Sequence, residues 1–143
     1  MYLVCFNRKD EKPREEYYYG TEAEAMHHAS LFDDDDSNLY KNIVVSDETE
    51  NKVLKVILFD DDGTATCFKD GDIVRLHPDF SSEAERRYLY VLKNINDRMM
   101  RGQIVCLNLN MAIPSAETVG LNMIVPTKLG KEDILNAYNN ASL

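Results

Sequence analysis

The run KVLKVILF, residues 52–59, constrains the fold more than any other stretch of the chain. It is almost entirely apolar, which is typical of a strand that other elements cover on both faces. We therefore expect a central strand of a sheet here. The length of 143 residues suffices for one ordinary domain or two very small ones.

The segments around this run predict the order strand, strand, helix, strand, strand for the first half of the chain. The four strands are expected at residues 2–6, 15–20, 39–47 and 52–59. The helix begins at a capping box, in which Thr21 is followed three residues later by Glu24. It is expected to continue to Phe32, because Ala25, Ala29 and Phe32 recur at helical spacing.

The second half opens with turn dipeptides, Asp62-Gly63 and Asp70-Gly71. Strands are expected at residues 72–77, 86–96, 102–109 and 122–126, and a short helix at 131–138. Short strands separated by closely spaced Gly, Asp and Asn turns predict a small barrel.

One segment of this half, residues 82–99, fits two structures. A helix would begin at the Ser82–Glu85 capping box and carry Ala84, Tyr88, Leu92, Ile95 and Met99 on one face. The aromatic and β-branched residues at 88–95 favour a strand instead, and we adopt the strand.

The order of FKDGDIVRL, a long β pair and a short terminal strand resembles SH3-like barrels over residues 68–126. The expected fold class is therefore α+β. A ββαββ sheet-and-helix layer of residues 1–62 packs with a small SH3-like barrel in residues 63–143, which ends in the short helix. Each piece is near the lower size limit for independent folding, so we expect one unfolding transition.

The formal net charge of −9 is confined to the first half of the chain. Residues 1–62 carry 7 Lys and Arg against 16 Asp and Glu, whereas residues 63–143 carry 9 of each. This asymmetry indicates two surfaces with different roles. The alternative is that acidic loops only keep a small protein soluble.

The most concentrated charge is a run of four aspartates, Asp33, Asp34, Asp35 and Asp36. A calcium loop that starts at Asp34 needs glycine and a carboxylate where Leu39 and Val45 stand, so a calcium site is not expected. Taken singly, these residues fit a solvated loop. Because like charges repel and aspartate is unfavourable after a helix C-terminus, we predict that they form an acidic recognition face with Glu22 and Glu24.

Other chemistry is not indicated. Cys5, Cys67 and Cys106 each sit among apolar neighbours, which is typical of buried residues in strands rather than of a disulfide framework or a nucleophile. Adjacent His27 and His28 would point about 100° apart on a helix and could not chelate one ion together. We expect no metal, no cofactor and no enzymatic activity, no membrane span and a cytoplasmic location.

A second candidate site is basic. Its members are Arg86, Arg87, Tyr88, Tyr90, Lys93, Arg98 and Arg101. Cations interleaved with aromatic rings suit single-stranded nucleic acid, since the cations bind phosphates and the rings stack on bases. Alternatively, the tyrosines belong to the core and the cations to a solvated face, and the overall acidity weakens binding to nucleic acid.

Two functions follow from these patterns. In the first, an acidic face binds a basic, nucleic-acid-handling protein such as a nuclease, as an inhibitor or adaptor. Small, acidic and free of motifs, the chain resembles the anti-CRISPR and anti-restriction accessory proteins of bacterial mobile elements, which implies mimicry of nucleic acid. In the second, the C-terminal barrel binds nucleic acid or a peptide, and the acidic half is a solubilising or regulatory module.

Overall fold

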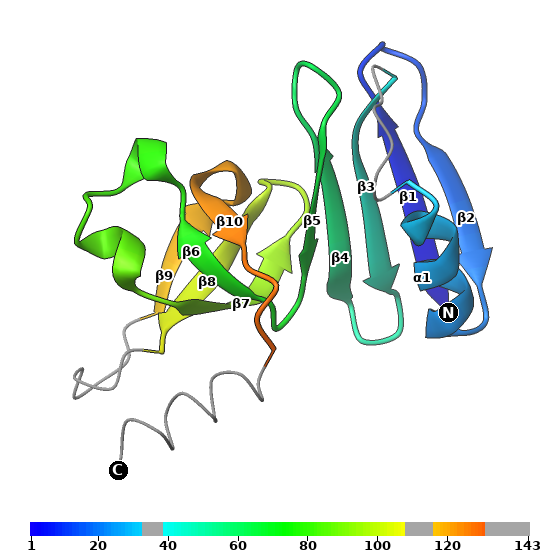
Figure 1. The fold of residues 1–143 in the computed structure, drawn as a ribbon. Helices are drawn as coiled ribbons and strands as arrows, with labels where there is room; N and C mark the ends of the chain where they lie inside the picture. The colour runs from blue at the N-terminus through cyan, green and yellow to red at the C-terminus, as the bar shows by residue number, and fades with distance from the viewer. Residues whose placement is uncertain (33–38, 108–115, 131–143) are drawn as a thin grey trace. The chain divides into compact units, whose positions relative to one another are not determined.

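The computed structural model describes residues 1–32, 39–107 and 116–130. These residues form ten strands, one α-helix and three short 3-10 helices (Figure 1). The strands make two five-stranded antiparallel sheets, so the fold is mixed α+β, as the sequence predicts. The chain divides into two compact units: residues 1–70 with 94–101, called unit 1, and residues 71–93 with 102–143, called unit 2.

Unit 1 is built on a sheet with the strand order β2-β1-β3-β4-β5. Its strands are β1 Tyr2–Arg8, β2 Glu15–Tyr19, β3 Tyr40–Asp47, β4 Lys52–Phe59 and β5 Ala65–Lys69. The predicted order ββαββ is confirmed by β1, β2, α1, β3 and β4. The apolar strand β4 lies between β3 and β5, the interior position that its sequence predicts.

The helix α1, Glu22–Ser30, covers one face of this sheet. Its Ala25 and Ala29 side chains are fully buried, and small side chains let the helix approach the strands closely. Together with them, the core contains Val4, Phe6, Ile43, Val45, Ile57 and Phe59. The helix ends two residues before the predicted Phe32; near this end the Ser30 hydroxyl donates to the His27 carbonyl at 2.7 Å.

The strand β5 was not predicted as part of this layer. A tight turn joins it to β4: the Gly63 N–H donates to the Asp60 carbonyl at 2.9 Å, and the Asp60 N–H to the Thr64 carbonyl at 3.1 Å. Gly63 has φ 90°, a conformation that glycine adopts without steric cost. The sequence ATCFK has a weak β pattern, so pairing with β4 and burial of Phe68 make it a strand.

Unit 2 is built on a sheet with the order β10-β6-β7-β8-β9. Its strands are β6 Ile73–Leu76, β7 Tyr90–Asn96, β8 Arg101–Cys106, β9 Ala116–Gly120 and β10 Ile124–Pro126, with 3-10 helices η1 Pro78–Phe80, η2 Glu85–Arg87 and η3 Leu121–Met123. The turn that joins β7 to β8 groups with unit 1. The buried core of unit 2 contains Val74, Leu92, Ile104, Leu121 and Ile124.

The strand predicted at residues 86–96 is confirmed for residues 90–96, where β7 runs, and is wrong at its start, where residues 85–87 form η2. The capping box before it is also real. The Ser82 N–H donates to the Glu85 carboxylate at 3.0 Å, and the Glu85 N–H to the Ser82 hydroxyl at 3.3 Å. The cap begins only the short η2, because Tyr90 and Val91 pair with β6 and must be extended.

Two predictions for the second half go beyond what is described. The sheet order ends at β10 and β9, and no pairing among the described residues closes it into the SH3-like barrel. The helix predicted at 131–138 lies outside the described residues.

Within the ranges that are described, no helix has both the length and the apolar character that a bilayer crossing requires.

Candidate functional site: the charged surfaces of unit 1

The predicted acidic face is described only in part. Asp33, Asp34, Asp35 and Asp36 lie outside the described residues. Glu22 and Glu24 occupy the first turn of α1 and are exposed. The Glu24 N–H donates to the Thr21 hydroxyl at 3.3 Å, and that hydroxyl donates to the Glu24 carboxylate at 2.9 Å. Glu24 therefore supports the helix N-terminus, where negative charge also suits the helix dipole.

Three carboxylates raise the pKa of Tyr2, which lies at the beginning of β1. The pKa of Tyr2 is raised most by the charge of Asp47, which lies opposite it in the β1–β3 register, then by burial and by Glu22 and Glu50. Each negative charge disfavours the phenolate. The raised pKa thus marks a negative potential that α1 and the turn after β3 produce together. Asp47 and Glu50 are not among the site residues predicted from the sequence, although the acidic turn DETEN is the signal that points to them.

The turn between β3 and β4 orders its own carboxylates. Asp47 accepts from the backbone N–H of Thr49 at 3.0 Å and of Glu50 at 3.2 Å. These bonds direct Asp47 toward its own turn, while the side chains of Glu48 and Glu50 are exposed. Among the described residues, no three His, Cys, Asp or Glu side chains converge as a metal site requires.

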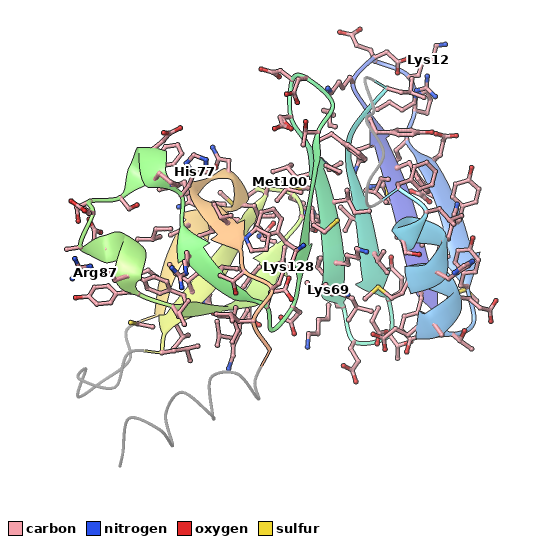
Figure 2. The ribbon with its side chains drawn as sticks, viewed as in Figure 1. Lys12, Lys69, His77, Arg87, Met100 and Lys128 are labelled. Atoms are coloured by element: carbon pink, nitrogen blue, oxygen red, sulfur yellow. The ribbon has the colours of Figure 1, made fainter. Side chains whose placement is uncertain are left out.

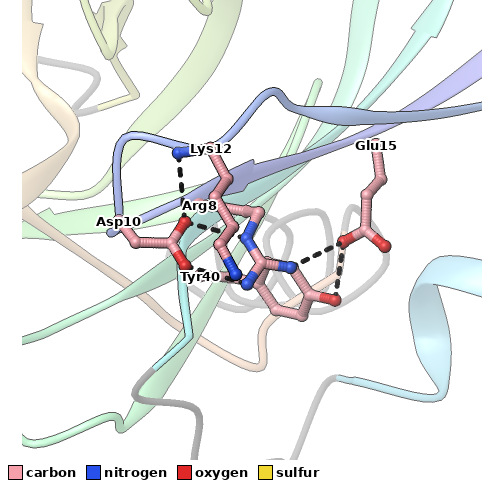
Figure 3. Close-up of polar contacts among 5 residues, drawn as sticks. All are labelled: Arg8, Asp10, Lys12, Glu15 and Tyr40. Atoms are coloured by element: carbon pink, nitrogen blue, oxygen red, sulfur yellow. Dashed lines mark hydrogen bonds and ion pairs between the residues drawn. The ribbon is translucent and has the colours of Figure 1, made fainter.

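The turn between β1 and β2 carries three cations, Lys9, Lys12 and Arg14, against two carboxylates, Asp10 and Glu11. Figure 3 shows polar contacts around this turn. Arg8 donates to both carboxylate oxygens of Asp10, from Nε at 2.8 Å and from Nη2 at 2.9 Å. Its Nη1 lies 3.8 Å from Glu15, which accepts from the Tyr40 hydroxyl at 2.9 Å. The hydrogen bonds from Arg8 are the main reason that the pKa of Asp10 falls to about 2. Because its cations outnumber its carboxylates, this turn adds no net negative charge to unit 1.

The turn between β4 and β5 adds a second group of carboxylates, Asp60, Asp61 and Asp62. Lys9 links this turn to Leu39. The Lys9 N–H donates to the Leu39 carbonyl at 2.8 Å, and Lys9 Nζ donates to the Asp60 carbonyl at 3.0 Å. Asp62 accepts from the Thr64 N–H at 3.0 Å, and this bond lowers the pKa of Asp62. Leu39 and the acidic β4–β5 turn therefore meet beside Lys9.

Aromatic side chains pack where α1 meets β1 and β2. His28 Nδ1 lies 2.7 Å from the Tyr19 hydroxyl, and the His28 ring centroid lies 4.9 Å from that of Tyr17 and 5.2 Å from that of Phe6. Burial lowers the pKa of His28, and the charge of neighbouring His27 lowers it further. A neutral imidazole can accept from the Tyr19 hydroxyl. His28 therefore acts in packing.

The predicted basic segment is divided between the two units. Its unit 2 members are Arg86, Arg87, Tyr88, Tyr90 and Lys93, and its unit 1 members are Arg98 and Arg101. The Arg86 side chain is outside the described part. Arg87, seen at η2 in Figure 2, Tyr88 and Lys93 are exposed. Burial raises the pKa of Tyr90, so that ring belongs partly to the core.

A hollow of about 680 Å³ lies within unit 1, on the sheet face that carries Leu3 and Cys5. Its charged lining residues are the cations Arg14, Lys52 and Arg98 and the acids Glu48 and Asp97. Nucleic-acid grooves carry one sign of charge, and this lining mixes both signs. Burial is the main reason that the pKa of the Cys5 thiol is raised, which makes the thiol a poor nucleophile.

Comparison of the chain with protein-family models, with curated proteins and with solved structures finds no match. Its function is therefore inferred from the charge and geometry of its own residues.

Proposed function

We propose that the chain is a non-enzymatic, cytoplasmic protein that presents a carboxylate-rich surface of unit 1 to a basic protein that handles nucleic acid. One observation carries the proposal: the negative charge belongs to one structural unit. Unit 1 has 10 Lys and Arg against 18 Asp and Glu, a net charge of −8, and unit 2 has 6 against 7, a net charge of −1. A field of one sign over one unit steers an oppositely charged partner.

The described carboxylates support this surface from separate elements. Glu22 on α1, Asp47 at the end of β3 and Glu50 in the β3–β4 turn all raise the pKa of Tyr2. Carboxylates spread over a packed sheet can occupy a site that normally holds phosphates, because both are anionic hydrogen-bond acceptors. A basic nuclease is the kind of partner that the resemblance to anti-CRISPR and anti-restriction proteins implies. Occupying its nucleic-acid site would make the chain an inhibitor.

The aspartate run provides the first test. Asp33→Asn, Asp34→Asn, Asp35→Asn and Asp36→Asn together remove four charges and keep side-chain size. We expect association with immobilised basic nucleases to slow several-fold at low salt, with an unchanged circular dichroism spectrum. A wild-type on-rate and salt dependence for every nuclease that binds the chain would refute the role of these aspartates.

A matched pair of variants tests the described surface in the same assay. Glu22→Gln with Glu50→Gln removes two charges beside Tyr2, and Glu83→Gln with Glu117→Gln removes two exposed charges from unit 2. We expect the first pair to slow association and the second to leave it nearly unchanged. Equal slowing by both pairs would show that only total charge matters.

The alternative function is binding of nucleic acid or a peptide by unit 2 as an SH3-like barrel. Two observations favour it: β10, the last strand of the described residues, returns to pair with β6, the first strand of the unit, and Arg87 precedes an exposed ring, Tyr88. Pull-downs with single-stranded DNA in place of the nucleases separate the two functions. Retention on DNA without retention on any nuclease would favour this alternative.

A further inference from the structure

The strand β2 is an edge of the unit 1 sheet. Among the described residues it pairs with β1 alone, and Figure 1 shows it as the outer strand of this sheet. Natural edge strands usually prevent further pairing with lysine, proline or a bulge. Glu15–Tyr19 contains neither lysine nor proline, its two charged residues, Glu15 and Glu16, lie beside Arg8 and Arg14, and its register with β1 is continuous over five residues. Its outer N–H and C=O groups can therefore accept another strand.

Both faces of this edge expose an aromatic ring. The Tyr17 side chain is 42% exposed and the Tyr18 side chain 57% exposed. Tyr17 lies opposite Val4, on the face that α1 covers, and Tyr18 lies opposite Leu3, on the other face. Burying such rings across a strand pair is favourable on either face.

The charges of the edge are balanced locally, although unit 1 as a whole is acidic. Glu16 accepts from Arg14 Nε at 2.6 Å and from the Tyr18 hydroxyl at 3.2 Å. Glu15 lies 3.8 Å from Arg8. A basic strand would gain little from carboxylates that already have partners, and a second copy of the same strand would meet little repulsion at the contact.

We propose that β2 pairs antiparallel with β2 of a second copy, about a two-fold axis at Tyr17, so that two unit 1 sheets join into one. In this register Tyr17 faces Tyr17, and Glu16 of each copy faces Tyr18 of the other. All five residues of each strand are then paired, and no like charges face each other.

The neighbouring registers are less favourable. Opposed side chains must lie on the same face, so the two-fold axis must pass through a residue. The neighbouring registers therefore have their axes at Glu16 and at Tyr18. An axis at Glu16 would place two carboxylates directly opposite each other. An axis at Tyr18 would place Glu16 opposite Gly20, which offers no side chain. Like-charge repulsion therefore disfavours the axis at Glu16, and the missing side chain of Gly20 disfavours the axis at Tyr18, which leaves the register centred on Tyr17.

Sedimentation velocity over a concentration series tests the proposal. We expect the wild-type chain to shift from monomer to dimer with concentration. Tyr18→Glu places a carboxylate opposite Glu16 twice in each dimer, and we expect it to weaken dimerisation roughly tenfold. Tyr88→Glu adds the same charge to an exposed tyrosine of unit 2 and should leave dimerisation nearly unchanged.

Tyr18→Lys tests the register itself. It loses the same ring as Tyr18→Glu but places an ammonium group opposite Glu16, so it should dimerise more tightly than Tyr18→Glu. Equal weakening by both variants, or a wild-type chain that stays monomeric at every concentration, would overturn the proposal. If Tyr18→Glu instead leaves the mass unchanged and slows binding to the nucleases, β2 is the docking strand of a partner and the dimer is wrong.

Hydrogen exchange of the wild-type chain gives an independent result that needs no variant to fold. Backbone amides of residues 15–19 should exchange more slowly as concentration rises, while those of β5, the other edge, should not change. Unchanged exchange in β2 would also overturn the proposal. The dimer does not depend on the proposed function, since that function rests on carboxylates outside β2.

Discussion

Unit 1 and unit 2 are each built on a five-stranded sheet, but their interiors differ in chemistry. In the described residues, every ring–ring contact except His77–Phe80 lies in unit 1, around α1 and its strands. The buried core of unit 2 is aliphatic, with Leu92, Ile104, Leu121 and Ile124. The unit with the aromatic interior is also the unit with the net charge of −8 counted above.

There is a physical reason for unit 1 to combine an aromatic interior with a high net charge. Concentrated like charge destabilises a compact unit by self-repulsion. Aromatic rings bury large areas and gain further from edge-to-face packing, such as the 5.5 Å contact between Phe6 and Tyr17. The interior of unit 1 thus offsets the repulsion among its acidic loops. Unit 2, which is nearly neutral, has no comparable repulsion to offset.

The largest effect is expected from truncating the cores. Ile57 in unit 1 and Leu121 in unit 2 are both fully buried, and Ile57→Ala or Leu121→Ala should each lower the free energy of unfolding by about 2–5 kcal/mol. Urea unfolding followed by circular dichroism measures this. One transition that shifts in both variants is expected. A transition that stays at its wild-type midpoint in either variant would show that the units unfold separately.

A smaller effect, specific to unit 2, is expected at Gly102. A Cβ atom there would lie 2.5 Å from Leu92 Cδ1 and 3.7 Å from Leu121 Cδ2. Because Leu92 is fully buried, it cannot move away freely, and Gly102→Ala should cost about 1–3 kcal/mol. Gly20→Ala is the control in unit 1, since nothing lies within 4 Å of its Cβ position. Equal unfolding midpoints for the two variants would contradict this packing.

The smallest effect is a pH dependence from the aromatic cluster of unit 1. The pKa of His28 is lowered in the folded chain, so the unfolded chain binds its proton first as pH falls. The contribution of neutral His28 is complete above the ordinary pKa of about 6.5 and declines as pH falls below it. Thermal melts between neutral and mildly acidic pH measure this. His28→Gln should flatten the profile in that range, and an equally steep profile in the variant would contradict the assignment.

Local sequence patterns determined much of the fold. The apolar run of β4 indicated an interior strand because its side chains need cover on both faces. Thr21 and Ser82 each indicated a cap, and both caps formed, because a cap needs only residues a few positions apart. The β-branched residues of β7 predicted a strand correctly. Charge counting indicated which half of the chain is acidic.

Only the tertiary structure decided which of these residues act together. β5 is a strand because it pairs with β4. The helix that begins at Ser82 is only the short η2, because the following strand β7 pairs with β6. The basic segment is contiguous in sequence, yet its members belong to two units. Glu22 is far in sequence from Asp47 and Glu50, yet all three raise the pKa of Tyr2. Local sequence patterns reflect interactions between residues that are close in sequence. Strand pairing and electrostatic potential depend instead on distances between residues that come close only in the folded chain.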